Sequence, residues 1–246
     1  NNTLIKNNVI RNMGGEGLEI NPRTASSGMT IEGNAIHSVG FATCNDGGTR
    51  SCRPAIVLNI NQSGALSNVI IRNNLMWNTA SGCVWEKSLS RGTASPQILN
   101  NSCYDYGKGT LTNNQPQGFS AQGTGSTAIV RNNIIMAPNG TDPFGVGVSF
   151  TADHNICESG SACGSSSIAW TSTTVMSTSE SSADFFKISD SSIASATGTN
   201  LYSSGVTVDY AGAQRLSTGA FDVGAFAVNA NLTTAVPAAP TSLSAN

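Results

Sequence analysis

Six short segments share one pattern, in which hydrophobic positions flank a polar pair that ends in Asn. The segments are 4–10, 30–36, 70–76, 97–103, 129–135 and 151–157. The shared Asn is Asn8, Asn34, Asn74, Asn101, Asn133 and Asn155, with spacings of 26, 40, 27, 32 and 22 residues. Self-similarity at this period is typical of a solenoid, in which each copy forms one coil and the longer spacings carry loops.

Alternating positions around the shared Asn predict which side chains face the core. The third residue before it and the second after it are apolar or Cys in every copy, whereas the second before and the third after are mostly charged or aromatic. This period of two predicts short β-strands on both sides of an Asn turn. Stacked about 4.8 Å apart, the Asn amides would bond to the coils above and below and satisfy buried turn backbone. We therefore expect an all-β fold of at least six coils of parallel strands with a structural Asn ladder.

These motifs resemble the right-handed parallel β-helix superfamily, which includes pectate lyases, alginate lyases, chondroitinase B and rhamnogalacturonases. A second resemblance lies in residues 209–215 and 221–226, which look like the closing segment of many secreted bacterial β-helix proteins. Ala227 stands where that segment usually ends in Glu. The resemblance implies a right-handed parallel β-helix, a location outside the cell or on its surface, and a polysaccharide as partner.

The chain divides into an expected β-helix domain over 1–235 and a Pro/Ala/Ser linker over 236–246, which resembles the start of a fibronectin type III module. Residues 159–208 are rich in Ser and Thr, and we expect irregular final coils and a return segment there. Because the first motif begins at once, we also expect further coils or a cap upstream of Asn1.

Composition excludes several functions. Lys and Arg number 12 against 14 Asp and Glu, so no basic stripe for nucleic acid is expected. No apolar run is long enough to insert into a membrane, and we expect a monomer. The six cysteines form no paired CxxC motifs, which argues against zinc and favours disulfides in an exported protein. Cys44 with Cys52 and Cys157 with Cys163 bracket short loops, which leaves Cys83 with Cys103 as a third pair; buried free thiols are the alternative.

Two candidate sites follow from these patterns. His37, Trp77 and Tyr104 share one outward position on successive copies and would form a ring platform for a glycan, unless loops such as 38–53 cover them. The cluster at 85–91, expected on a loop after the third motif, vaguely resembles the Lys-Ser stretch of the alginate lyase and chondroitinase B family. That resemblance implies Lys87 as base and Arg91 as acid, with Ca²⁺ as cofactor, although no Asn with paired Glu that would hold calcium is found upstream. Solvated loop charges are the alternative.

A hydrolase would instead need two carboxyl groups on one face, and Asp105 with Glu86 or Asp46 would supply them. Two functions therefore stay open. The chain is either the C-terminal part of a secreted, polysaccharide lyase-like protein acting on or binding an acidic glycan, or a non-catalytic glycan-binding or stalk domain.

Overall fold

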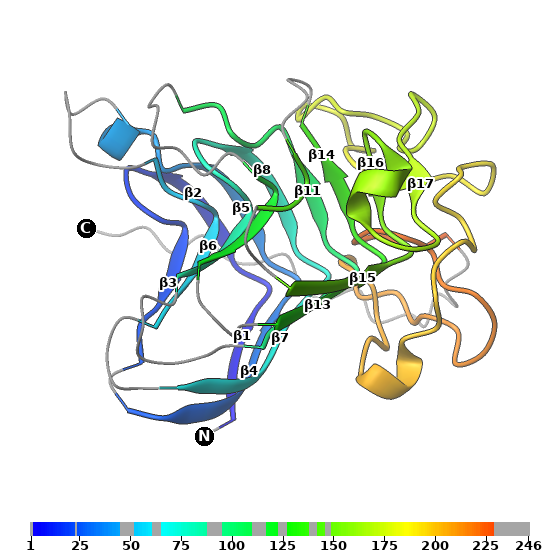
Figure 1. Ribbon diagram of the computed structural model, residues 1–246. Helices are drawn as coiled ribbons and strands as arrows, with labels where there is room; N and C mark the ends of the chain where they lie inside the picture. Colours follow the sequence, from blue (N-terminus) through cyan, green and yellow to red (C-terminus); the bar gives the residue numbers. More distant parts are fainter. Residues whose placement is uncertain are drawn as a thin grey trace.

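The computed structural model describes residues 2–22, 24–44, 52–60, 65–87, 95–109, 117–122, 127–137, 142–145 and 149–228. Three parallel sheets wind around one core, so that successive coils contribute successive strands to each sheet (Figure 1). The expected right-handed parallel β-helix is therefore confirmed.

The sheets are named A, B and C in the order in which each coil passes through them. Sheet A consists of β1 (Thr3–Lys6), β4 (Ser26–Glu32), β7 (Leu66–Arg72), β10 (Gln97–Leu99), β13 (Thr127–Arg131) and β15 (Ser149–Asp153). Sheet B consists of β2 (Val9–Met13), β5 (Ala35–Val39), β8 (Leu75–Thr79), β11 (Ser102–Tyr104), β14 (Ile134–Met136), β16 (Ile156–Cys157) and β17 (Ile168–Ala169). Sheet C consists of β3 (Leu18–Ile20), β6 (Ile56–Asn59), β9 (Val84–Lys87) and β12 (Phe119–Gln122). The described 3₁₀ turns are η1 (Ala42–Cys44), η2 (Gly160–Cys163) and η3 (Tyr202–Ser204).

The core consists of the inward columns that the sequence predicts. In sheet A, Ile31, Ile71 and Val130 are fully buried at the position three before the ladder. Each of these fully buried branched side chains stabilises the fold by about 1.5–3 kcal/mol relative to the same side chain in water. Leu99 lies in the outward column, two before the ladder, and is still only 1% exposed because Leu201, Val206 and Phe221 pack over it.

The Asn ladder forms between sheets A and B. Each ladder amide from Asn8 to Asn133 donates to the Oδ1 of the next ladder residue, at distances of 2.9–3.0 Å. That same Oδ1 accepts the preceding ladder residue's backbone N–H at 2.9–3.0 Å. The ladder thus satisfies turn backbone from Asn8 to Asn133, as expected, and Ser167 Oγ accepts the Asn155 backbone N–H at 3.0 Å.

The chain contains three disulfides. They are Cys44–Cys52, Cys83–Cys103 and Cys157–Cys163. The Cys83–Cys103 bridge joins the start of sheet C to sheet B and lies in the main core. All three expected pairings are confirmed.

Residues 170–228, here called the C-terminal segment, pack back on the solenoid (Figure 1, yellow to orange-red). Apart from η3, this segment consists of turns and isolated bridges. Val175, Phe185, Phe186 and Val223 bury the outer face of sheet B. Within the range 159–208, where irregular final coils and a return segment were expected, η2 and β17 come first and the packed-back segment begins at residue 170. The linker at 236–246 lies outside the described residues.

Candidate functional site

A bend crosses two neighbouring strands of sheet A. Gly28 in β4 and Asn68 in β7 have left-handed backbone angles, with φ of 73° and 52°. They are lateral neighbours, since Ser27 pairs with Ser67 and Met29 with Val69. A left-handed residue inside a strand turns the chain, as a bulge does, and here both strands turn at the same level (Figure 1). Gly28 suits this left-handed angle, and a Cβ there would displace the end of the Asn2 side chain.

The outer face of β1, β4 and β7 is the floor of a groove of about 680 Å³. Leu4, Thr30 and Ile70 line the floor from one outward column, and Thr207 and Val208 of the C-terminal segment line the far side. Asn2, Ser27 and Asn68 add amide and hydroxyl groups at the bend. The groove therefore offers apolar surface beside hydrogen-bonding groups.

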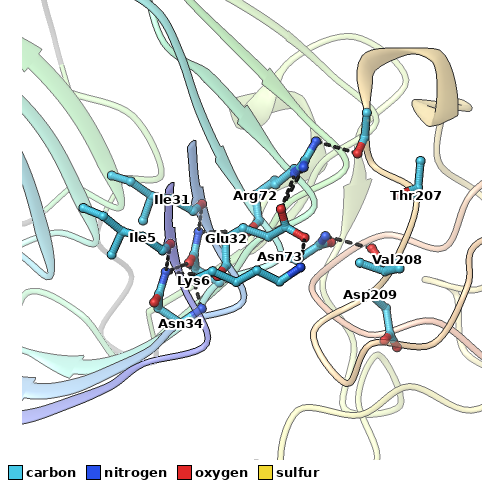
Figure 2. A network of polar contacts seen from close by, with 12 residues as sticks. Ile5, Lys6, Ile31, Glu32, Asn34, Arg72, Asn73, Thr207, Val208 and Asp209 are labelled. Atoms are coloured by element: carbon cyan, nitrogen blue, oxygen red, sulfur yellow. Dashed lines mark hydrogen bonds and ion pairs between the residues drawn. The ribbon is translucent and has the colours of Figure 1, made fainter. Parts of the chain in front are cut away.

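Three charged side chains stand in one column at the other end of this groove. Lys6, Glu32 and Arg72 are register neighbours on β1, β4 and β7. Arg72 holds Glu32 through Nε at 3.0 Å and Nη2 at 2.7 Å, and Lys6 Nζ lies 3.2 Å from Oε1 (Figure 2). The Glu32 side chain is 6% exposed, whereas that of Lys6 is 39% exposed. Two cations against one carboxylate leave a formal excess of one positive charge.

The wall of the groove is tied to the same strand. Arg72 Nη1 also donates to the Gly205 carbonyl, and Asn73 Nδ2 donates to the Val208 carbonyl at 2.8 Å (Figure 2). The groove thus exists only where the C-terminal segment docks on β7.

A second column of turn residues holds this segment in place. Asn73, Asn100 and Asn132 precede the ladder residues and have φ of 52°, 51° and 56°. Their side chains point away from the ladder, and their amides donate to backbone carbonyls of Val208, Asp222, Gly224 and Thr199. The sequence analysis assigned no role to these residues, although the repeated Asn-Asn pairs were a signal for two distinct columns.

Arg215 is a buried residue that holds parts of the C-terminal segment together. It is 3% exposed and donates to the carbonyls of Asp222, Gly224 and Ala225 at 3.0–3.2 Å. Burial lowers the pKa of Arg215 to about 10, opposed by the charges of Asp209 and Asp222. Burial also raises the pKa of Asp209. At the position of the usual final Glu, the Ala227 backbone N–H donates to Asp209 at 3.0 Å.

The predicted ring platform is covered. His37 and Trp77 are stacked 4.0 Å apart at 8°, so the outward column is aligned as expected. Trp77 is only 8% exposed because Phe185 packs against it, and Tyr104 packs on Phe186. Among the described residues the cover comes from the C-terminal segment, and part of the expected loop 38–53 lies outside them. Burial lowers the pKa of half-buried His37, with Glu180 raising it and Arg11 lowering it further.

The predicted catalytic residues are dispersed. Lys87 and Glu86 lie on β9 rather than on the expected loop, since sheet C extends that far. Glu86 occupies an inward position beside Leu58 and Ala121 and is 2% exposed. Lys87 faces outward, with Nζ 5.4 Å from the Trp85 ring centre.

Asp105 stands at the corner before sheet C, with φ of 53°, and pairs with Lys108 at 2.7 Å. Lys87 is the last residue of β9, whereas Asp105 stands before the start of sheet C. The length of a four-residue strand, about 13 Å, therefore lies between the corner of Asp105 and the level of Lys87. Arg91 and Asp46 lie outside the described residues.

Among the described residues, no three His, Cys, Asp or Glu side chains gather as metal ligands would. The same part of the chain holds no helix with the length and hydrophobicity needed to cross a bilayer.

Comparison with known proteins gives one similar structure. No family model matches the sequence, and no curated protein matches it. The crystal structure of pectate lyase Pel9A aligns with 92% of this chain at 15% identity, with a TM-score of 0.47. The chain spans 65% of the length of that protein. By its own three parallel sheets and Asn ladder, the chain is a right-handed parallel β-helix.

Proposed function

We propose that the chain binds an acidic polysaccharide in the groove on the outer face of sheet A. The observation that carries the proposal is the column of Lys6, Glu32 and Arg72 at one end of an open groove of about 680 Å³. Arg72 holds Oε2 of Glu32 with two hydrogen bonds, whereas Lys6 meets Oε1 at 3.2 Å and its side chain is 39% exposed, so Lys6 is the charge that a ligand carboxylate can recruit. Surface ion pairs are worth about 0–1 kcal/mol, and Glu32 keeps its Arg72 partner when the Lys6 ammonium turns to a ligand carboxylate, so the exchange costs little.

The rest of the groove suits a sugar chain. Sugars present C–H faces and hydroxyl groups together, and Leu4, Ile70 and Val208 stand beside Thr30 and Asn68 in the lining. A largely pre-formed, mixed surface of this kind binds without reorganising the fold.

Binding rather than hydrolysis is proposed because of the carboxylate count. A two-carboxylate glycosidase needs partners about 5–9.5 Å apart. Glu32 is the one acidic residue among those described that line the groove, and Arg72 and Lys6 both hold it. We further propose that the protein acts outside the cell, where the three disulfides are stable.

The test is calorimetric titration of the purified chain with polygalacturonate and other uronate-containing oligosaccharides at low and high salt. Lys6→Gln should weaken binding several-fold and flatten the salt dependence, because one screened charge pair is lost. Thr30→Trp should block the groove floor. Lys187→Gln removes a comparably exposed lysine in the C-terminal segment and should leave affinity unchanged.

Equal affinity in Lys6→Gln, Thr30→Trp and the parent chain would refute this location of the site. The same mixtures, followed with and without Ca²⁺ for unsaturated uronate absorbance and for reducing ends, report any cleavage. Absorbance that disappears in Lys87→Ala would instead favour a lyase centred on β9.

A further inference from the structure

A second hollow of different chemistry lies beside the groove, beyond the bend. This hollow has a volume of about 270 Å³ and is lined by Ala25, Ser26, Ser27, Ala65 and Ser67. Ser27 lines both spaces, so they meet at the level of Gly28 and Asn68. Asn68 Nδ2 donates to Ser27 Oγ at 3.2 Å across this junction.

The two ends differ in charge. Lys6, Glu32 and Arg72 stand at one end, whereas the described lining of the second hollow consists of Ser and Ala alone. Along β4 the distance from Glu32 to Ser26 is about 20 Å at the usual strand rise, enough for several sugar units in a row. A chain bound here would run along the strands, around the coil, instead of along the solenoid axis.

We propose that the two-part groove selects a polysaccharide in which acidic units alternate with neutral ones. This inference rests on the proposed function. An acidic unit pairs with Lys6 at the charged end, and a neutral unit donates and accepts hydrogen bonds at the serines. A carboxylate in the second hollow would lose water without gaining a cation from its described lining, so a chain that is acidic at every unit is disfavoured there.

The experiment compares two hexasaccharides by calorimetry. One is from hyaluronan, which alternates a uronate with a neutral N-acetylhexosamine, and the other is from polygalacturonate, which is acidic throughout. Ser67→Lys places a cation in the second hollow. Thr127→Lys adds the same charge on β13 of sheet A, at an exposed residue that does not line either space, and serves as the matched control.

The parent chain should bind the hyaluronan fragment several-fold more tightly. Ser67→Lys should raise affinity for the galacturonate fragment about two- to fivefold, the effect of one exposed ion pair, and change the hyaluronan affinity less. Thr127→Lys should leave the ratio of the two affinities unchanged, and Lys6→Gln should weaken both ligands together.

Tighter binding of the galacturonate fragment by the parent chain would overturn the inference while leaving the proposed function standing. An unchanged affinity ratio in Ser67→Lys would overturn it as well. If neither fragment binds and the uronate titrations above are also silent, the proposed function fails, and the inference fails with it.

Discussion

Asn74→Ala is the sharpest test of the ladder. Asn74 is fully buried, and its amide donates to the Ile31 carbonyl at 2.9 Å and to Asn101 Oδ1 at 2.9 Å. Its Oδ1 accepts the Asn34 backbone N–H at 3.0 Å and the Asn34 amide at 2.9 Å. The substitution therefore removes partners from the coils on both sides.

The magnitude follows from which groups lose these bonds. The Asn34 N–H and the Ile31 carbonyl each lose a buried partner, and an unsatisfied buried group costs about 1–3 kcal/mol. The Arg72 carbonyl keeps the Gly33 N–H at 3.3 Å, and Asn34 keeps its own bonds to Ile5 and Glu32. We expect a loss of about 2–6 kcal/mol in the free energy of unfolding.

Asn8→Ala is the matched control at the end of the ladder. Asn8 makes its side-chain bonds as a donor and is partly exposed, so water replaces its partners. We expect a loss below about 1 kcal/mol. Urea unfolding followed by circular dichroism measures both variants, with the slope m checked for constancy. Similar midpoint shifts for the two variants would refute the view that the ladder stabilises the fold by satisfying buried turn backbone.

Three other outcomes are expected. Arg215→Met should destabilise the C-terminal segment by about 3–5 kcal/mol, because buried carboxylates lose their countercharge, and limited proteolysis should then cut within 199–226. Burial lowers the pKa of His37 below 6.5, so the unfolded chain binds a proton there at a higher pH than the folded chain does. Stability should therefore fall as the pH drops through 6.5. His37→Gln should remove that part of the fall in melting temperature between about pH 8 and pH 5. Replacing Cys83 and Cys103 together by Ala should cost about 3 kcal/mol, read from the urea midpoint without reductant, since the bridge closes 20 residues of chain.

The fold was predictable because every coil repeats the same local constraint. A buried Asn such as Asn101, with apolar Ile98 and Cys103 at fixed offsets, specifies both the turn and the direction of the flanking strands. Register then follows, since a slip by one residue would place the apolar column in water. The disulfides were predictable for a different reason, because Cys44 with Cys52 and Cys157 with Cys163 are separated by only 8 and 6 residues and leave Cys83 with Cys103 as the third pair.

The groove was not predictable from the same patterns. It depends on left-handed backbone at Gly28 and Asn68, which break the strand pattern without repeating along the chain. Its wall, Thr207 and Val208, is far from β7 in sequence, and the Asn73–Val208 hydrogen bond spans 135 residues. The outward direction of Trp77 was predictable but its cover by Phe185 was not, since a repeat-based argument shows which way a side chain points but not what later packs over it.

The corner between sheets A and B always takes two residues, from 7–8 in the first coil to 154–155 in the last. The connection from sheet B to sheet C, in contrast, runs from four residues at 14–17 to sixteen at 40–55. The ladder thus fixes the turn between sheets A and B in each coil. The connections at the other corners vary in length, and this variation leaves the strand pairing intact. Such a scaffold can exchange its loops one coil at a time, which suits it to evolving or engineering new surfaces without redesigning the core.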